Sequence, residues 1–164
     1  MVFEAVSREV PRMPGIDWVT PSGTIHVELR RDAAPVTVDF ISKAVQAGVY
    51  DSTSFYRSDF VLQGGLHGRR SNPLGDLAVN ETRLHTRLSN ARGTCAIAHF
   101  DVPDNGNTEW FVNLTDNPHL DDAYGGYCVF GHVDDPSLAV VDRLAAEIKT
   151  RGAVTITRAV LTPE

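Results

Sequence analysis

The chain has 164 residues, of which 42% are hydrophobic and 22% are charged, as expected for one globular domain with a substantial core. Its formal net charge of -6 argues against a nucleic-acid-binding protein, which needs a basic surface. No apolar run approaches the roughly 20 residues of a membrane span, so neither nucleic acid nor membrane is an expected partner.

The chain divides into a short extension and one predicted domain. Residues 1–15 have mixed polarity and lack the apolar core of a signal peptide, so we interpret them as an N-terminal extension. Residues 16–164 contain no internal repeat and are predicted to form a single domain. Cys95 and Cys128 lie in apolar strand-like runs, where buried free thiols are expected, and this favours a cytoplasmic location.

Two strands and a helix are predicted at the start of the domain. Residues 16–20 and 24–30 form strands joined by a hairpin turn, and the second strand alternates between apolar and polar side chains. Its inward side chains are Ile25, Val27 and Leu29, and its outward ones are His26, Glu28 and Arg30. A helix follows, beginning near Asp32 and Pro35 and ending at Gly48. Its apolar stripe consists of Val36, Phe40, Ile41, Ala44 and Val45.

Residues 55–65 are predicted to form two short strands that end at a glycine pair. Alternation turns Phe60 and Leu62 to one side and Val61 and Gln63 to the other. Arg57 stands beside these apolar side chains, and burying an unpaired charge costs several kcal/mol. Arg57 is therefore expected either to pair with a carboxylate or to face a groove that receives a ligand. The candidate partners are Asp59, Glu109 or another carboxylate of the chain.

The second half of the chain continues with strands, loops and one more helix. Strands are predicted at 94–100, 109–114, 127–133 and 154–161, separated by a long polar loop at 66–92, a turn at 101–108 and a loop at 115–126. A helix is expected between Asp135, as its cap, and Gly152. Its apolar stripe consists of Leu138, Val141, Ala145 and Ile148.

Roughly eight strands without a βαβ rhythm indicate an antiparallel sheet. Two amphipathic helices can cover the open ends of a small closed barrel, and closure removes exposed strand edges. We therefore predict a mainly β fold, a closed eight-stranded antiparallel β-barrel capped by two α-helices.

Several classes of chemistry lack a matching motif. The six histidines show no metal-ligand spacing with another His, Cys or carboxylate, and no nucleophile motif or glycine-rich phosphate loop is present. The sequence therefore predicts neither a metal site nor a cofactor. Simpler interpretations of the remaining candidates stay open at this point. Phe60, Trp110, Phe111 and Leu120 suit a plain barrel core, Gln63 a loop cap, and His99 and Tyr127 an exposed strand face.

Several short motifs, taken together and in their order along the chain, resemble those of one family, the cyclophilin-type peptidyl-prolyl isomerases. Phe55-Tyr56-Arg57 is similar to the Phe-His-Arg of that family, and Phe60-Val61-Leu62-Gln63-Gly64-Gly65 to its Phe-Met-x-Gln-Gly-Gly. The resemblance covers about residues 16–142, in family order throughout, and is nearest to bacterial members. Further segments that carry it are 23–29, 34–40, 92–99, 109–112, 119–121 and 129–131.

The resemblance implies an eight-stranded barrel with two helices, and an enzyme that rotates Xaa-Pro bonds without a cofactor. It implies that Arg57 is the catalytic donor to the twisted imide and that Gln63 holds the substrate backbone. The proline pocket would consist of Phe60, Val61, Phe111 and Leu120. The remaining substrate-binding positions would be Ala98, His99, Glu109, His119 and Tyr127. The implied partners are proline-containing peptides or unfolded protein segments, and a monomer is expected.

Four departures from the family pattern qualify this expectation. Two residues are missing between Arg57 and Phe60, so the turn must be tighter, although an even loss preserves the alternation. Glu109 replaces a glutamine and is able to pair with Arg57, and His99 replaces asparagine or arginine. His119 replaces the aromatic residue that helps bind cyclosporin, so weak cyclosporin binding is expected. The alternative function is a module that binds proline segments with little or no isomerase turnover.

Overall fold

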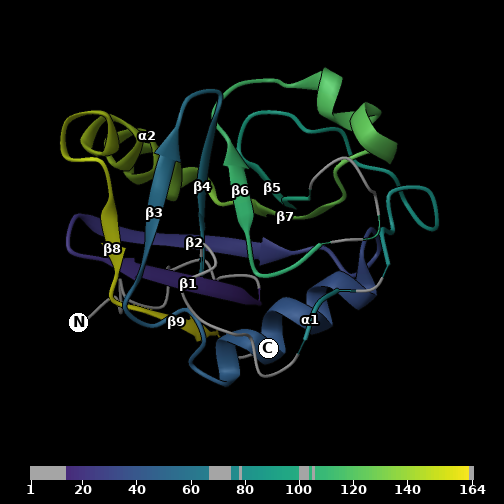
Figure 1. Cartoon of the computed structure of the whole chain (residues 1–164), viewed down its shortest axis with the longest axis horizontal. Coiled ribbons are helices and arrows are strands. Elements are labelled where there is room, and N and C mark those ends of the chain that lie inside the picture. The colour runs from purple at the N-terminus through teal and green to yellow at the C-terminus, as the bar shows by residue number, and fades with distance from the viewer. Residues whose placement is uncertain (1–13, 67–74, 78, 100–103, 105, 163–164) are drawn as a thin grey trace, which may run out of the picture.

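The computed structural model describes residues 14–66, 75–77, 79–99, 104 and 106–162. Within these ranges nine strands form one antiparallel sheet that curls into a nearly closed barrel, with two α-helices on opposite sides (Figure 1). The predicted mainly β, antiparallel barrel with two helices is confirmed. Residues 1–13, most of the predicted extension, lie outside the described residues. Neither α-helix of the described chain has the length and apolar character needed to span a bilayer.

The sheet order is β8-β3-β4-β6-β5-β7-β2-β1-β9. The strands are β1 (Gly15–Thr20), β2 (Gly23–Leu29), β3 (Thr53–Ser58), β4 (Val61–Gly65), β5 (Thr94–Ile97), β6 (Trp110–Asn113), β7 (Val129–Val133), β8 (Val154–Ile156) and β9 (Arg158–Leu161). The helices are α1 (Pro35–Gln46), α2 (Asp135–Arg151) and the short 3-10 helices η2 (Pro118–Asp121) and η3 (Ala123–Gly125).

The strand count differs from the prediction because the last predicted strand is bent. Residues 154–161 divide at Thr157 into β8, which pairs with β3, and β9, which pairs with β1. The Thr157 amide donates to the Val19 carbonyl at 2.8 Å, which holds the bend against β1. The two edges of the sheet are thus joined by the chain itself. The barrel is nearly closed with nine strands, rather than closed with eight.

The barrel interior is filled by aromatic side chains that alternation directs inward. Trp18, Tyr50 and Trp110 are almost completely buried, and the Trp18 ring centroid lies 4.3 Å from Trp110 and 4.9 Å from Tyr50. Cys95 and Cys128 are buried free thiols, as predicted, and burial raises the pKa of Cys128 to about 12. A separate, smaller apolar cluster lies outside this core. Its buried members are Val61, Ala96, Phe111, Leu120 and Val129.

The outward orientation predicted for His26 does not expose it to solvent. The side chain is completely buried, with its Nδ1 atom 2.8 Å from Asp17 Oδ1. The backbone amide of His26 donates to Ser137 Oγ at 2.9 Å, because α2 packs over this part of β2. Period-two alternation distinguishes the two faces of a strand, but it does not show that a helix from elsewhere in the chain covers the outer face.

Both helices also differ in detail from the prediction. Val36 was expected in the apolar stripe of α1 but is 48% exposed, whereas Thr37 and Val38 are buried. The side chain of Asp134, rather than Asp135, caps α2 by accepting from the Ser137 amide at 3.1 Å. The Ala34 side chain at the start of α1 offers no cap, so the first amides of that helix need acceptors from elsewhere.

Glu81 supplies those acceptors from the long loop between β4 and β5. Its carboxylate accepts from the Thr37 amide at 2.6 Å, from the Thr37 hydroxyl at 2.8 Å and from the Val36 amide at 3.2 Å. The side chain is 1% exposed, and His85 Nε2 lies 3.2 Å from Oε2. A carboxylate at a helix N-terminus is favoured by the helix dipole, so this contact fastens the loop to α1.

Replacing Glu81 with leucine should therefore destabilise the fold. The change leaves two buried donors and one partly buried donor without an acceptor, and we expect the free energy of unfolding to fall by about 3 kcal/mol or more. Urea unfolding followed by tryptophan fluorescence measures this loss. Asp76→Leu, an exposed carboxylate in the same loop, is the control and should change stability by less than about 0.5 kcal/mol. Equal effects of the two substitutions would contradict a fastening role for Glu81.

Candidate active site

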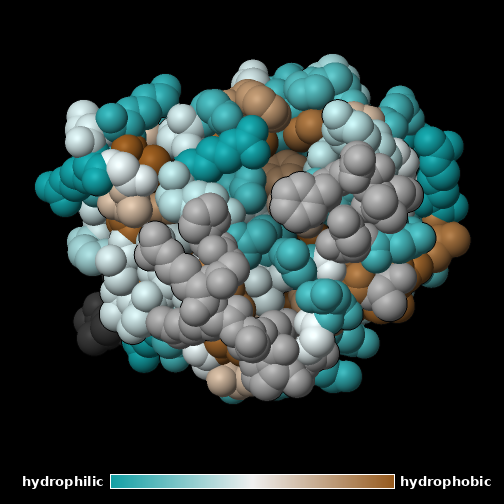
Figure 2. All heavy atoms as spheres, in the orientation of Figure 1, coloured by the Kyte–Doolittle hydropathy of each residue, from teal (hydrophilic) through white to brown (hydrophobic). Residues whose placement is uncertain are grey.

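A groove of about 250 Å³ lies over the barrel wall, and ten of the eleven site residues predicted from the sequence line it. The ten are Arg57, Phe60, Val61, Gln63, Ala98, His99, Glu109, Phe111, Leu120 and Tyr127. His119 is the exception, and its ring meets Phe60 edge to face at 5.5 Å. Asn107 also lines the groove and was not predicted. On this face hydrophobic atoms are seen between hydrophilic side chains (Figure 2).

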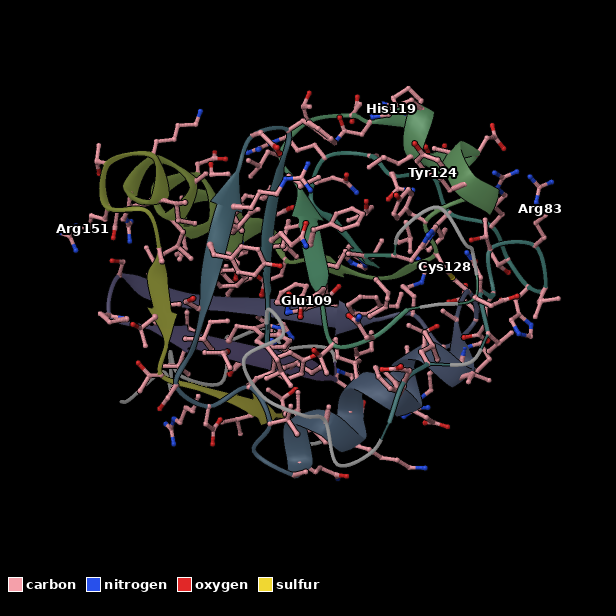
Figure 3. All side chains as sticks on the ribbon, in the orientation of Figure 1. Arg83, Glu109, His119, Tyr124, Cys128 and Arg151 are labelled. Atoms are coloured by element: carbon pink, nitrogen blue, oxygen red, sulfur yellow. The ribbon has the colours of Figure 1, made fainter. Side chains whose placement is uncertain are left out.

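The apolar wall of the groove is the smaller apolar cluster. It is built from strands whose side chains alternate between the main core and the groove. On β6, Trp110 and Val112 enter the main core, and Phe111 between them enters the groove. Val61 and Phe111 are only 2% and 3% exposed. Leu120 reaches the same cluster from η2. Glu109 lies at the start of β6 and His119 on η2, beyond the other end of the strand (Figure 3).

Arg57 both pairs with a carboxylate and lines the groove, so the two alternatives left by the sequence occur together. Its Nε donates to Asp59 Oδ2 at 2.8 Å, and its Nη1 donates to Gln63 Oε1 at 3.0 Å. The guanidinium carbon lies 5.3 Å from the centre of the Phe60 ring, within cation–π range. Among the described residues these contacts occupy two of the five guanidinium N–H groups, so three are left to face a ligand.

The short turn after Arg57 is closed by Asp59. The Asp59 amide donates to the Val61 carbonyl at 3.1 Å, and Asp59 Oδ1 accepts from the Val61 amide at 3.1 Å. The same carboxylate therefore closes the turn and holds the arginine. Arg57 and Gln63 are cross-strand partners of β3 and β4, which places their side chains in contact.

Glu109 contacts Tyr56, and of the two carboxylates named as candidates Asp59 is the one that forms an ion pair with Arg57. The Tyr56 hydroxyl donates to Glu109 Oε1 at 2.5 Å and accepts from Gln63 Nε2 at 2.9 Å. Burial raises the pKa of Tyr56, and the hydrogen bond to the Glu109 carboxylate raises it further. Tyr56 was not predicted as a site residue, because adjacent side chains of a regular strand face opposite ways. The register shift between Phe55 and Arg57 is the irregularity that brings both neighbours to this network.

His99 and Tyr127 form a stacked pair at another part of the groove. Their ring centroids are 4.1 Å apart and the rings are nearly parallel, with an angle of 13°. His99 Nε2 lies 2.8 Å from the Gly126 carbonyl, and the Tyr127 hydroxyl donates to the His99 carbonyl at 3.3 Å. Burial raises the pKa of Tyr127. The neighbouring Ala98 amide donates to the Glu109 carbonyl at 2.9 Å, so that amide is already paired.

Asp121 joins the segment that carries Leu120 to the loop at 89–90. Its carboxylate accepts from the Ser89 hydroxyl at 2.6 Å, and from the amide and side chain of Asn90 at 2.7 and 2.9 Å. Burial alone would raise the pKa of Asp121, but these hydrogen bonds outweigh burial and leave the pKa below its ordinary value of 3.8. Within the described residues, no three His, Cys, Asp or Glu side chains gather closely enough to hold a metal ion.

Comparisons with known proteins agree on one family. The model of the family described as cyclophilin type peptidyl-prolyl cis-trans isomerase/CLD matches residues 16–161. A peptidyl-prolyl cis-trans isomerase of Acinetobacter baylyi is 31% identical over 134 residues, which cover 79% of this chain and 71% of that protein. Peptidyl-prolyl cis-trans isomerase B of Escherichia coli is 33% identical over 138 residues, which cover 79% of this chain and 82% of that protein.

A solved structure shares the fold at lower sequence identity. The cyclophilin type peptidyl-prolyl cis-trans isomerase of Cryptosporidium parvum, solved in the presence of the dipeptide Ala-Pro, superposes with a TM-score of 0.74. The two sequences are 19% identical, and the match covers 92% of this chain and 99% of that one. This likeness therefore supports the barrel architecture.

The lowered pKa of Asp121 predicts how the fold responds to acid. Because the native carboxyl binds its proton less tightly than the unfolded one, its stabilisation is fully present above pH 3.8 and is lost as the pH falls through the lower native value. Asp121→Asn should therefore be less stable than the wild type at neutral pH, and the difference should shrink below about pH 4. Urea unfolding between pH 2.5 and 7, taken as roughly the carboxyl titration range, measures it.

The neighbouring carboxylate provides the control for this titration. The Asp122 side chain is 74% exposed, and exposed ion pairs contribute little. Asp122→Asn should therefore follow the wild-type pH profile closely. A stability difference for Asp121→Asn that stays constant across the whole pH series would contradict the assignment.

Proposed function

The chain belongs to the cyclophilin-type peptidyl-prolyl cis-trans isomerases, and on that premise we propose that it accelerates rotation about Xaa-Pro bonds with Arg57 stabilising the twisted imide. The substrates are proline-containing peptides and unfolded protein segments. Uncatalysed rotation crosses a barrier of about 18–20 kcal/mol, because the resonance of the amide must be broken. Exchange at Xaa-Pro bonds is slow enough to limit folding, so an isomerase of this kind assists protein folding.

The proposed chemistry requires only binding and one donor. In the twisted transition state the imide nitrogen regains its lone pair and becomes a hydrogen-bond acceptor. An Arg57 N–H directed at that nitrogen stabilises the twisted form more than either planar isomer, and this difference in binding is what accelerates the reaction. Two hydrogen bonds support this role. The guanidinium donates to Asp59 and to Gln63 with one part only, so its other N–H groups are left for the substrate.

The groove offers matching positions for the rest of the peptide. Val61, Phe111 and Leu120 present an apolar wall to the groove, and Phe60, which is 38% exposed, lies at its rim. Gln63 would hold the substrate backbone while it supports Arg57. The remaining contacts to an extended peptide are assigned to Ala98, His99, Glu109, His119 and Tyr127.

A second candidate function is a module that binds proline segments with little turnover. The observation that favours it is the 2.8 Å ion pair of Arg57 with Asp59, which partly neutralises the guanidinium. Both side chains of that pair are more than two-fifths exposed, however, at 43% and 45%, so water screens the attraction. The donor strength of the remaining N–H groups is therefore largely kept, which favours the enzyme.

We also propose a monomeric protein that acts in the cytoplasm. The two cysteines support this location, because both are free and buried and neither forms a disulfide. The exposed large hydrophobic side chains of the described chain are few and come from separate segments, which supports a monomer. They are Val36, Phe60, Leu84, Tyr124 and Val160.

Substitution of Arg57 by alanine tests the function directly. We expect isomerisation of an Ala-Pro peptide, measured by NMR exchange spectroscopy, to be fast with the wild type and to fall by roughly 10²- to 10³-fold in Arg57→Ala, because the donor to the imide nitrogen is lost. Peptide binding, measured by chemical-shift titration, should weaken much less. Binding without accelerated exchange by the wild type would favour the binding module instead.

The chain offers a matched control for this substitution. Arg30 pairs with Asp32 through its Nε and Nη2 at 2.9 and 2.8 Å, the same two-residue spacing as Arg57 and Asp59, but it does not line the groove. Arg30→Ala removes a comparable ion pair and should leave the exchange rate unchanged. Similar losses in both variants would indicate that ion pairing, rather than a directed donor, is responsible.

Cyclosporin should bind weakly, since His119 offers a smaller and more polar ring at the groove rim than the aromatic residue it replaces. We expect calorimetry to give a dissociation constant above about 1 μM, which corresponds to a binding free energy no stronger than about -8.2 kcal/mol. His119→Trp should tighten binding at least about tenfold by adding apolar contact next to Phe60. Submicromolar binding by the wild type would refute this expectation.

A further inference from the structure

The Gln63 carboxamide can be turned in two ways, and only one of them supports Arg57. A carboxamide has a donor end and an acceptor end of almost equal size, so packing alone does not select between them. In the observed orientation Oε1 accepts from Arg57 Nη1, and Nε2 donates to the Tyr56 hydroxyl. The opposite orientation would place the amide N–H groups against the guanidinium, where donor would face donor.

Glu109 fixes the direction of the whole network, because an ionised carboxylate only accepts hydrogen bonds. The Tyr56 proton therefore points to Glu109 Oε1, at 2.5 Å, and the phenol oxygen is left to accept from Gln63. These three hydrogen bonds then run the same way, from Arg57 to Gln63, from Gln63 to Tyr56 and from Tyr56 to Glu109. Turning the Gln63 carboxamide would break two of these three bonds.

Glu109 is itself held firmly in place. Its amide donates to Asn107 Oδ1 at 2.9 Å, and its Oε2 accepts from the Thr108 hydroxyl at 3.1 Å. Gly65, with a φ of +147°, lies directly beneath the carboxylate, and a Cβ at that position would lie 2.2 Å from Oε2. The second glycine of the pair that ends β4 thus makes the space in which this carboxylate sits.

We propose that Tyr56, anchored by Glu109, is a positioning residue that selects the productive orientation of Gln63 and thereby directs the Arg57 guanidinium into the groove. This inference rests on the proposed function, in which Arg57 is the donor to the imide nitrogen. Tyr56 keeps its proton at neutral pH, because burial and the neighbouring carboxylate raise its pKa. A glutamine at position 109 would be able to donate as well as accept, so it would not impose one direction on the network.

Tyr56→Phe tests the proposal, because it keeps the ring and removes only the hydroxyl. We expect kcat for an Ala-Pro peptide to fall roughly tenfold while KM changes less than about twofold, since the donor is misdirected but the apolar wall is intact. In the free protein the Gln63 side-chain amide and Arg57 Nε–H signals in ¹⁵N NMR spectra should shift and broaden. Ser137→Ala is the control, because it removes a buried hydroxyl that accepts from the His26 amide beneath α2, and Ser137 does not line the groove. It should leave kcat unchanged and the Gln63 signals in place.

Substitutions at Glu109 separate positioning from general damage to the fold. Glu109→Gln keeps an acceptor oxygen and should lose less activity than Tyr56→Phe, whereas Glu109→Met removes the acceptor and should lose as much. The double variant Tyr56→Phe/Glu109→Met should have a kcat no lower than that of Tyr56→Phe, because the two residues act on Arg57 through one chain of hydrogen bonds, whereas loss of the peptide contact assigned to Glu109 raises KM.

Two results would overturn the inference. One is a Tyr56→Phe protein with wild-type kcat and unshifted Gln63 and Arg57 signals, and the other is strictly additive losses in the double variant. A wild type without isomerase activity would defeat the proposed function alone. The Gln63 and Arg57 signals of the free protein would still decide whether Tyr56 orients the network, since they require no turnover.

Discussion

The site depends on the cost of placing a guanidinium against an apolar barrel wall. The Arg57 side chain is 43% exposed, so it is only partly desolvated there, and its protein partners offset the cost of that part. Complete pairing would remove the charge as a source of hydrogen bonds. The structure meets both demands because protein groups accept from only some of the guanidinium N–H groups. Asp59 and Gln63 hold Nε and one N–H of Nη1, the Phe60 ring lies beneath the cation, and the rest of the group faces the groove.

That division is possible because the holding residues lie on, or in the turn between, two hydrogen-bonded strands. Arg57 and Gln63 face each other across β3 and β4, and the turn between these strands is closed by the same Asp59 that grips the arginine. A donor mounted on paired strands has little freedom to follow the substrate into its planar ground states. In the proposed mechanism, such a donor favours the twisted form selectively, which a side chain on a flexible loop would do less well.

Much of this arrangement follows from local sequence pattern, and the rest depends on contacts that no pattern contains. Period-two alternation places Trp110 in the core and Phe111 in the groove, and the family resemblance points to the residues that line it. The structure adds what comes from distant segments or local irregularity. Helix α2 buries His26, a loop carboxylate at Glu81 caps α1, and a register shift in β3 brings Tyr56 into the polar network. None of these has a signature within a few residues of the chain.

Tyr56 and Glu109, which replace other residues of the family pattern at the groove, are better explained together than separately. Considered alone, Glu109 is a negative charge near a catalytic cation, and it would be expected to weaken the donor. With tyrosine at position 56, the carboxylate accepts from a phenol that also accepts from Gln63. In the proposed positioning role, the effect of Glu109 on Arg57 is to orient it rather than to neutralise it. Gly65 then leaves the room that the carboxylate needs beside the strand. A member of this family that carried only one of the two replacements would have either an uncompensated charge or an unanchored phenol, which is a physical reason for positions 56 and 109 to vary together.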